Sequence, residues 1–129
     1  MVYDYDLFYI SGTSSSSSTS IPLYLNGSST NGPVTTPDDY YQKVNRMVIS
    51  NSASTTQYVS LTATPNSQVL PSGTPSIPIA TFSVPSTGTL ILSDEDIQSS
   101  VPPGYYLSAS VPSAVSGITV SASAYFVKG

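Results

Sequence analysis

Few side chains in this chain are suited to acid–base or nucleophilic chemistry. It has no His and no Cys, seven Asp and Glu, and three Lys and Arg. Asp4 and Asp6 alternate with Tyr3 and Tyr5, so both carboxylates would face one side of a strand. Paired carboxylates hydrolyse glycosides in many enzymes. We favour a solvated strand face, because catalytic carboxylates lie in clefts that perturb them.

The densest acidic cluster is Asp94-Glu95-Asp96. Calcium prefers oxygen ligands of this kind, but the EF-hand spacing is missing. Ser93 precedes the cluster and Pro102-Pro103 follow it, which predicts one short helical turn near 94–100. The acidic side chains would lie at the positive end of its dipole. We therefore expect a helix cap here, with no metal ligand and no cofactor.

A serine nucleophile in this chain would lack a base. A Ser-His-Asp triad is impossible without His, and Tyr stands three residues before both Lys43 and Lys128. We expect no catalytic residue and no enzyme. The formal net charge of −4 also argues against nucleic acid as a partner, since phosphate binding needs a cationic surface.

The tyrosines are the best candidates for a functional role, and the chain has ten of them. Tyrosine offers rigid contact area with a polar tip and is enriched at interfaces. Burial in the core, with the hydroxyl satisfied, is the alternative, and both interpretations stay open. Exposed rings also stack on sugars, which keeps a carbohydrate-binding module as a hypothesis. The interface candidates are Tyr3, Tyr5, Phe8, Tyr9, Tyr24, Tyr40, Tyr41, Tyr105 and Tyr106.

Short strands are the elements that would position these residues. Alternating or β-branched runs are separated by turn residues about every eight to twelve positions, as in sandwiches and barrels. We predict an all-β, antiparallel β-sandwich, jelly-roll or Ig-like, of about seven or eight short strands. The predicted strands cover residues 2–10, 21–25, 44–50, 56–64, 77–84, 89–92, 104–111 and 118–127.

Three local features refine this prediction. The loop 112–117 is short enough for the last two strands to pair as an antiparallel hairpin. Alternation breaks between Val44 and Met47, which indicates a β-bulge. Residues 1–20 are expected to form a Tyr-rich N-terminal arm and a Ser-rich linker, ahead of a single domain over 21–129. We expect no signal peptide and no membrane span.

From Val44 onward the order of features resembles a family of viral proteins. A strand ending in Asn51-Ser52 is followed by a strand containing Val59-Ser60-Leu61. Later, the segment 102–110 (PPGYYLSAS) precedes the terminal strand. This order is similar to that of small β-sandwich structural proteins of virions, of the tail, neck, fibre or capsid-decoration type, in tailed phages. Tyr105 departs from it, because Asp is common at that position.

The composition is also similar to that of structural proteins of archaeal viruses, which are rich in Ser, Thr and Tyr and poor in charge. The chain contains 27 Ser and 14 Thr, and only 8% of its residues are charged. The resemblance implies a virion structural subunit that is assembled in the host cytoplasm and packs with copies of itself and other virion proteins. The alternatives are a binding module for a host-surface glycan or receptor, and a filament or coat subunit at the extracellular surface.

Overall fold

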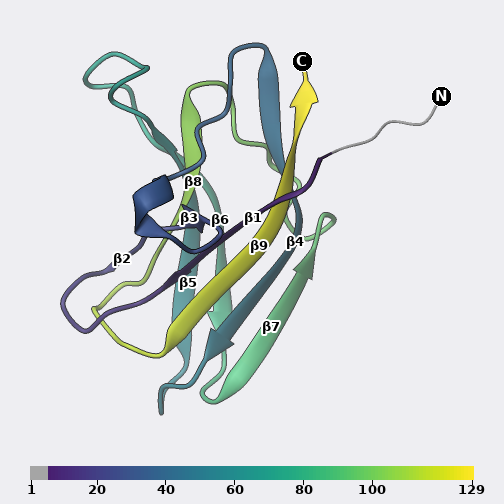
Figure 1. Ribbon diagram of the computed structural model, residues 1–129. Coiled ribbons are helices and arrows are strands. Elements are labelled where there is room, and N and C mark those ends of the chain that lie inside the picture. The colour runs from purple at the N-terminus through teal and green to yellow at the C-terminus, as the bar shows by residue number, and fades with distance from the viewer. Residues whose placement is uncertain (1–5) are drawn as a thin grey trace.

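Two antiparallel β-sheets packed face to face form the fold in the computed structural model, which describes residues 6–129 (Figure 1). The sheets are built from alternating sequences, in which every second side chain turns to the core. The elements in chain order are β1 (Phe8–Thr13), β2 (Ser20–Ile21), β3 (Tyr24–Leu25), the 3-10 turn η1 (Ser29–Asn31), β4 (Tyr40–Asn51), β5 (Gln57–Pro65), β6 (Ile77–Val84), β7 (Gly88–Ser93), β8 (Tyr105–Ser110) and β9 (Ile118–Lys128). The predicted all-β sandwich is thus confirmed.

The strand order is that of a jelly roll. One sheet has the order β3-β1-β9-β4-β7 and the other has the order β2-β8-β5-β6. Setting aside the two-residue β3 leaves β1-β9-β4-β7 facing β2-β8-β5-β6, which is the eight-stranded arrangement of two Greek keys. Of the two architectures expected from the sequence, the strand order therefore selects the jelly roll over the Ig-like sandwich.

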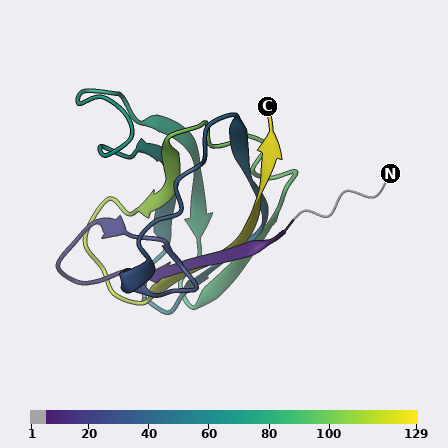
Figure 2. The same ribbon diagram turned by 45° about the horizontal axis from the view of Figure 1, so that its top comes forward.

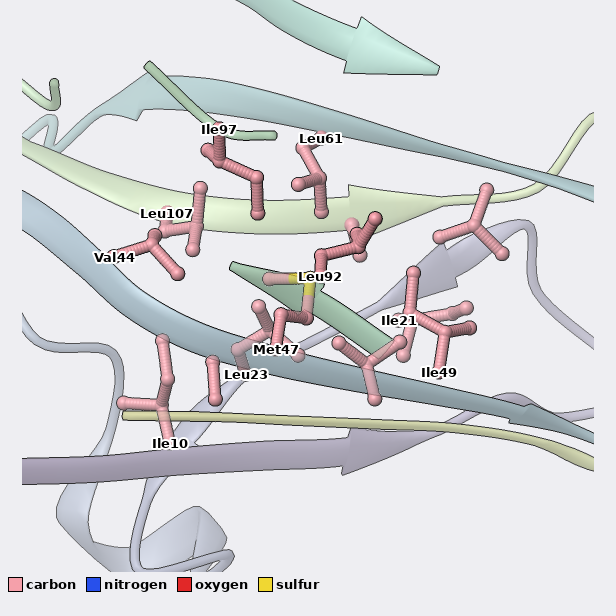
Figure 3. Packing of buried hydrophobic residues seen from close by; sticks show 14 of the residues in the cluster. Ile10, Ile21, Leu23, Val44, Met47, Ile49, Leu61, Leu92, Ile97 and Leu107 are labelled. Carbon is pink, nitrogen blue, oxygen red and sulfur yellow. The ribbon is translucent and has the colours of Figure 1, made fainter. Parts of the chain in front are cut away.

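The core lies between the two sheets and is made of aliphatic side chains. Figure 3 shows Met47 near its centre, with Leu61 and Leu107 on the opposite sheet. The alternating sequences of β5 and β9 each bury one face of the strand. Val59, Leu61 and Ala63 of β5 are buried, as are the alternating residues of β9 from Ile118 to Ala124. Alternation in the sequence therefore determined which face of these strands is buried.

The hairpin predicted between the last two strands is wrong. β8 pairs with β2 and β5, whereas β9 pairs with β1 and β4 in the other sheet. The connecting segment 111–117 crosses from one sheet to the other, and Val111 is buried in it. Leu107 and Ala109 of β8 share the core with Val120 and Ala122 of β9. Burial of both apolar faces favours this facing arrangement over a side-by-side one.

The turn predicted from Ser93 forms, but it does not continue as a helix. Asp96 accepts a hydrogen bond from the Ser93 backbone N–H at 2.8 Å, and the Glu95 N–H donates to the Ser93 hydroxyl. The chain then passes to Ile97, which is buried in the core, and one turn is too short to repay helix nucleation. Among residues 6–129 the one helical element is η1. It is neither long nor apolar enough to span a bilayer.

Part of the expected N-terminal arm belongs to the sandwich. β1 pairs with β9 over six residues, and Ile10 is buried. The serine run that follows it turns back at Ser15 and Ser18, which form a β-bridge, while Ser14 accepts a hydrogen bond from the Ile118 N–H at 2.9 Å. Residues 8–13 therefore form part of the five-stranded sheet. Tyr3 and Tyr5 lie outside the described residues.

A buried asparagine ties the end of β4 to the next corner of the sandwich. Asn51 is 2% exposed, and its amide Nδ2 donates to the carbonyl oxygens of Thr55, Val84 and Pro85 at 2.9–3.2 Å. Its Oδ1 accepts from the Ala53 N–H at 2.9 Å. One side chain thus satisfies backbone groups of two loops, β4–β5 and β6–β7, each of which connects one sheet to the other.

Candidate groove on the five-stranded sheet

A β-bulge in β4 shapes the outer face of the five-stranded sheet. The register of β4 against β9 shifts between Val44 and Arg46, so Asn45 is the extra residue. Asn45 and Arg46 are consecutive and both exposed, while Val44 and Met47 on either side are buried. The bulge predicted from the broken alternation is confirmed. In a regular strand, consecutive side chains point to opposite faces. The bulge instead places the amide of Asn45 and the guanidinium of Arg46 on the same face.

Small side chains on β9 leave a depression between β1 and β4. Ser121 and Ser123 of β9 form its floor, because Tyr9 on β1 and Arg46 on β4 are both paired with Ser123. The depression has a volume of about 480 Å³. We call it the β9 groove, and its lining residues are Tyr9, Ile10, Ser11, Asn26, Arg46, Val48, Ser121, Ala122 and Ser123.

The polar groups of the β9 groove lie at its walls and on its floor. Asn26 stands beside β1, where its backbone N–H donates to the Tyr9 carbonyl at 2.8 Å. Asn45 donates from Nδ2 to the Ser123 hydroxyl at 3.1 Å, and this hydrogen bond orients the Ser123 side chain on the floor of the groove. Tyr9 is 58% exposed and presents an aromatic ring at the rim. Amide, guanidinium and hydroxyl groups around an aromatic ring provide hydrogen bonds and stacking.

The size and the lining of the groove define which interactions it offers. Its size falls in the range of small-molecule sites. Among residues 6–129, the lining contains hydroxyl groups, one amide and one guanidinium, and no carboxylate or amine. These groups could form hydrogen bonds with a polar ligand and orient it.

The predicted interface residues do not form one patch. Tyr9 and Tyr41 are exposed, and of the candidates that the structure describes, Tyr9 alone lines the β9 groove. Phe8 and Tyr40 both contact Phe126, at ring-centroid distances of 4.9 and 6.5 Å. They form an aromatic cluster where β1, β4 and β9 meet. Phe8 therefore contributes to packing within the subunit.

Two further candidates meet in a second depression beside β3. Tyr24 and Tyr106 line it together with Pro22 and Pro33, and its volume is about 290 Å³. Tyr105 is half-buried against the core and donates its hydroxyl proton to the Pro75 carbonyl at 3.0 Å. This hydrogen bond ties β8 to the loop 66–76, which projects at the upper left in Figure 2.

Several exposed apolar residues were not among the sequence candidates. Ile91 is 60% exposed on β7, Val69 is 56% exposed in the loop 66–76, and Tyr58 is 53% exposed on β5. The alternation of β5 places Tyr58 on the face opposite to that of the buried Val59, so the exposure of Tyr58 could be predicted from the sequence pattern. The exposure of Ile91 depends on which strand lies at the sheet edge, and that is a property of the fold.

The acidic turn at 94–96 stands apart from the β9 groove. It lies beside Lys43 and Tyr125 at another depression, of about 240 Å³. In residues 6–129, His, Cys, Asp and Glu side chains do not gather in any group of three or more that could hold a metal ion. Ser93 and Asp96 close this turn by hydrogen bonds, but no helix follows for them to cap.

Comparison with known proteins produced no match: no family model, no curated protein and no solved structure corresponds to this chain. A functional assignment therefore depends on the topology and surface of the chain itself.

Proposed function

We propose that this chain is a non-enzymatic virion structural protein, a subunit of a viral tail, neck or capsid-surface assembly that acts through protein–protein packing. The observation that carries the proposal is a jelly roll with very little surface charge. Viral capsid domains are among the proteins that use this fold. Since one fold hosts many functions, the surface of the chain must also suit packing against other proteins.

The surface suits close packing between neutral neighbours. Charged residues make up 8% of the chain, against about 25% in an ordinary globular protein. Exposed apolar residues stand on both sheets and on a loop, at Tyr9, Tyr58, Val69 and Ile91. A surface with few charges associates with little electrostatic repulsion. The partners we propose are other copies of the chain and other virion proteins, in a virion assembled in the host cytoplasm.

Labelling of particles tests this proposal. The loop 66–76 projects from the sandwich, and a side chain at Gly73 would meet no atom within 4 Å. An epitope inserted after Ser72 should therefore leave the fold intact and remain accessible to antibody. We expect regular labelling of purified particles in electron micrographs, with the untagged chain as control. Tagged protein that is folded and abundant in the lysate but missing from particles would contradict the proposal.

Genome context separates the virion from the cell-surface alternative. Capsid, portal or terminase genes beside the coding sequence would favour a virus, whereas secretion or filament genes would favour a coat or filament subunit.

A second candidate function, carbohydrate binding, is favoured by the β9 groove. Tyr9 offers an aromatic face, and Asn26 and Arg46 offer hydrogen-bond donors around it. Lectin domains also use jelly rolls. A host-surface glycan would then be the ligand of a subunit that also packs in the virion.

We expect Tyr9→Ala to weaken glycan binding at least about tenfold, because stacking and ring burial contribute more than 1.4 kcal/mol. Isothermal titration with glycans found by array screening provides the measurement. Tyr58→Ala is the matched control, since Tyr58 is similarly exposed on the other sheet. Equal affinity of the Tyr9 variant and the parent, or the lack of any glycan ligand, would remove this candidate.

A further inference from the structure

The four sheet edges of the sandwich are not equally protected. β2 and β3 are two residues long, and short edge strands offer little to pair with. β6 carries Pro78, and its register against β5 shifts between Leu61 and Thr62. Proline and bulges are devices by which natural sheets block edge pairing. β7 has neither of these devices.

β7 is a regular edge strand without charge. Its six residues, Gly88–Ser93, pair in unbroken register with β4 on one side. On the other side no strand of residues 6–129 follows it in the sheet order. Figure 1 shows β7 as the outermost strand at the lower right. An edge with these properties presents unpaired backbone N–H and C=O groups to a further strand.

The exposed side chain of β7 adds an apolar contact to this edge. Ile91 is 60% exposed and pairs with Val48, which lines the β9 groove. Thr89 and Ser93 flank it on the same face and are neutral. A strand added to β7 would therefore meet backbone hydrogen-bonding groups and an isoleucine, with no charged residue on β7 itself to desolvate.

We propose that β7 pairs with β7 of a second copy of this chain, in antiparallel orientation, and joins the two five-stranded sheets into one. Charge selects the orientation and permits a second copy as the partner. Asp94-Glu95-Asp96 follow β7 directly. Parallel pairing would place two such acidic turns side by side. Antiparallel pairing places each of them beside the uncharged turn 85–88 of the other copy, so like charges stay apart.

This pairing is a two-fold contact, in which the same strand serves both copies. It extends the proposed function by naming one packing contact of the subunit, but it concerns the isolated chain as well. A monomer in solution would overturn the β7 contact and leave the virion proposal standing, because that proposal is tested by incorporation into particles.

Light scattering coupled to size-exclusion chromatography tests the contact over a range of concentrations. We expect a monomer–dimer equilibrium that Ile91→Lys weakens about tenfold or more, because two lysines would face each other across the contact. Val69→Lys is the matched control. It replaces an apolar side chain of similar exposure in the loop 66–76 with the same charge, and its dimerisation should match the parent.

A strictly monomeric parent chain at all concentrations would overturn the proposal, as would equal dimerisation of the Ile91 and Val69 variants. Circular dichroism and thermal melts confirm that both variants are folded. Ile91 points to solvent, so its replacement leaves the core untouched.

Single cysteines locate the contact, since the chain has none of its own. We expect disulfide-linked dimers from at least one of Thr89→Cys, Ile91→Cys and Ser93→Cys, because the residue on the two-fold axis faces the same residue of the other copy within disulfide range. Val69→Cys should stay monomeric under the same oxidation. Cross-linking at position 69 but at none of the three β7 positions would place the dimer contact elsewhere and overturn the proposal.

Discussion

Replacement of Asn51 by aspartate should lower the free energy of unfolding by about 4 kcal/mol at neutral pH, since it leaves a charge buried without a partner. The Asn51 amide donates to three backbone carbonyl oxygens and is 2% exposed. A carboxylate in its place would face those oxygens as an acceptor among acceptors. Urea denaturation followed by circular dichroism measures the loss.

The pH dependence of this variant separates charge from shape. Repulsion by the carbonyl oxygens and burial would raise the pKa of the introduced carboxyl above its value in the unfolded chain. The folded variant therefore binds more protons than the unfolded variant. Its free energy of unfolding falls as the pH rises above about 4, which is the pKa of an aspartate in the unfolded chain. The parent, with an uncharged amide, should lack this component. A variant equally unstable at acidic and neutral pH would contradict the explanation.

Asn31→Ala is the control for the loss of an asparagine. Asn31 donates to the Leu25 carbonyl at 2.7 Å but is exposed. Water replaces an exposed hydrogen bond, so we expect a cost of about 1 kcal/mol or less. A comparable loss in both variants would mean that burial is not what makes Asn51 important.

Replacement of Gly12 by alanine should destabilise the fold by about 3 kcal/mol or more, as overpacking against backbone does. A Cβ at this position would overlap the backbone carbonyl oxygen of Pro22. The neighbouring atom belongs to the backbone, so no side-chain rotation relieves the clash. β1 would have to separate from residues 22–23, which lie beneath it. Thermal and urea unfolding measure the effect.

Gly73→Ala is the matched control for the glycine substitution. Gly73 lies in the loop 66–76 with φ of +87°, and a Cβ there meets no atom within 4 Å. Its substitution should cost only the strain of a positive φ, about 1–2 kcal/mol. A Gly12 variant no less stable than the Gly73 variant would show that β1 can move away from Pro22 at little cost.

Most strands were predictable because their signal is local. The alternation in 57–65 and 118–127 follows from the two-residue period of a strand with one buried face. The break in alternation at Val44–Met47 predicted the bulge that presents Arg46. Ser93 and Asp96 predicted their own turn for the same reason, since the capping groups lie within three residues of each other.

The pairing of strands was not predictable from such local signals. The loop 112–117 fits either a hairpin or a crossing between sheets, and the choice depends on the apolar faces of all strands together. The expected arm illustrates the same limit. Its composition resembled that of a flexible extension, yet β1 buries Ile10 and pairs along β9.

The sequence alone determined the fold class, the faces of the strands, and the scarcity of acid–base groups, because these depend on composition and near-neighbour period. Tertiary structure decided the jelly-roll order, the β9 groove and the open edge at β7. Tyr9, Arg46 and Ser123 are far apart in the chain and meet because β1, β9 and β4 are adjacent. Which strands become neighbours depends on how all the apolar faces are buried together in one core. No single segment of the sequence contains that information.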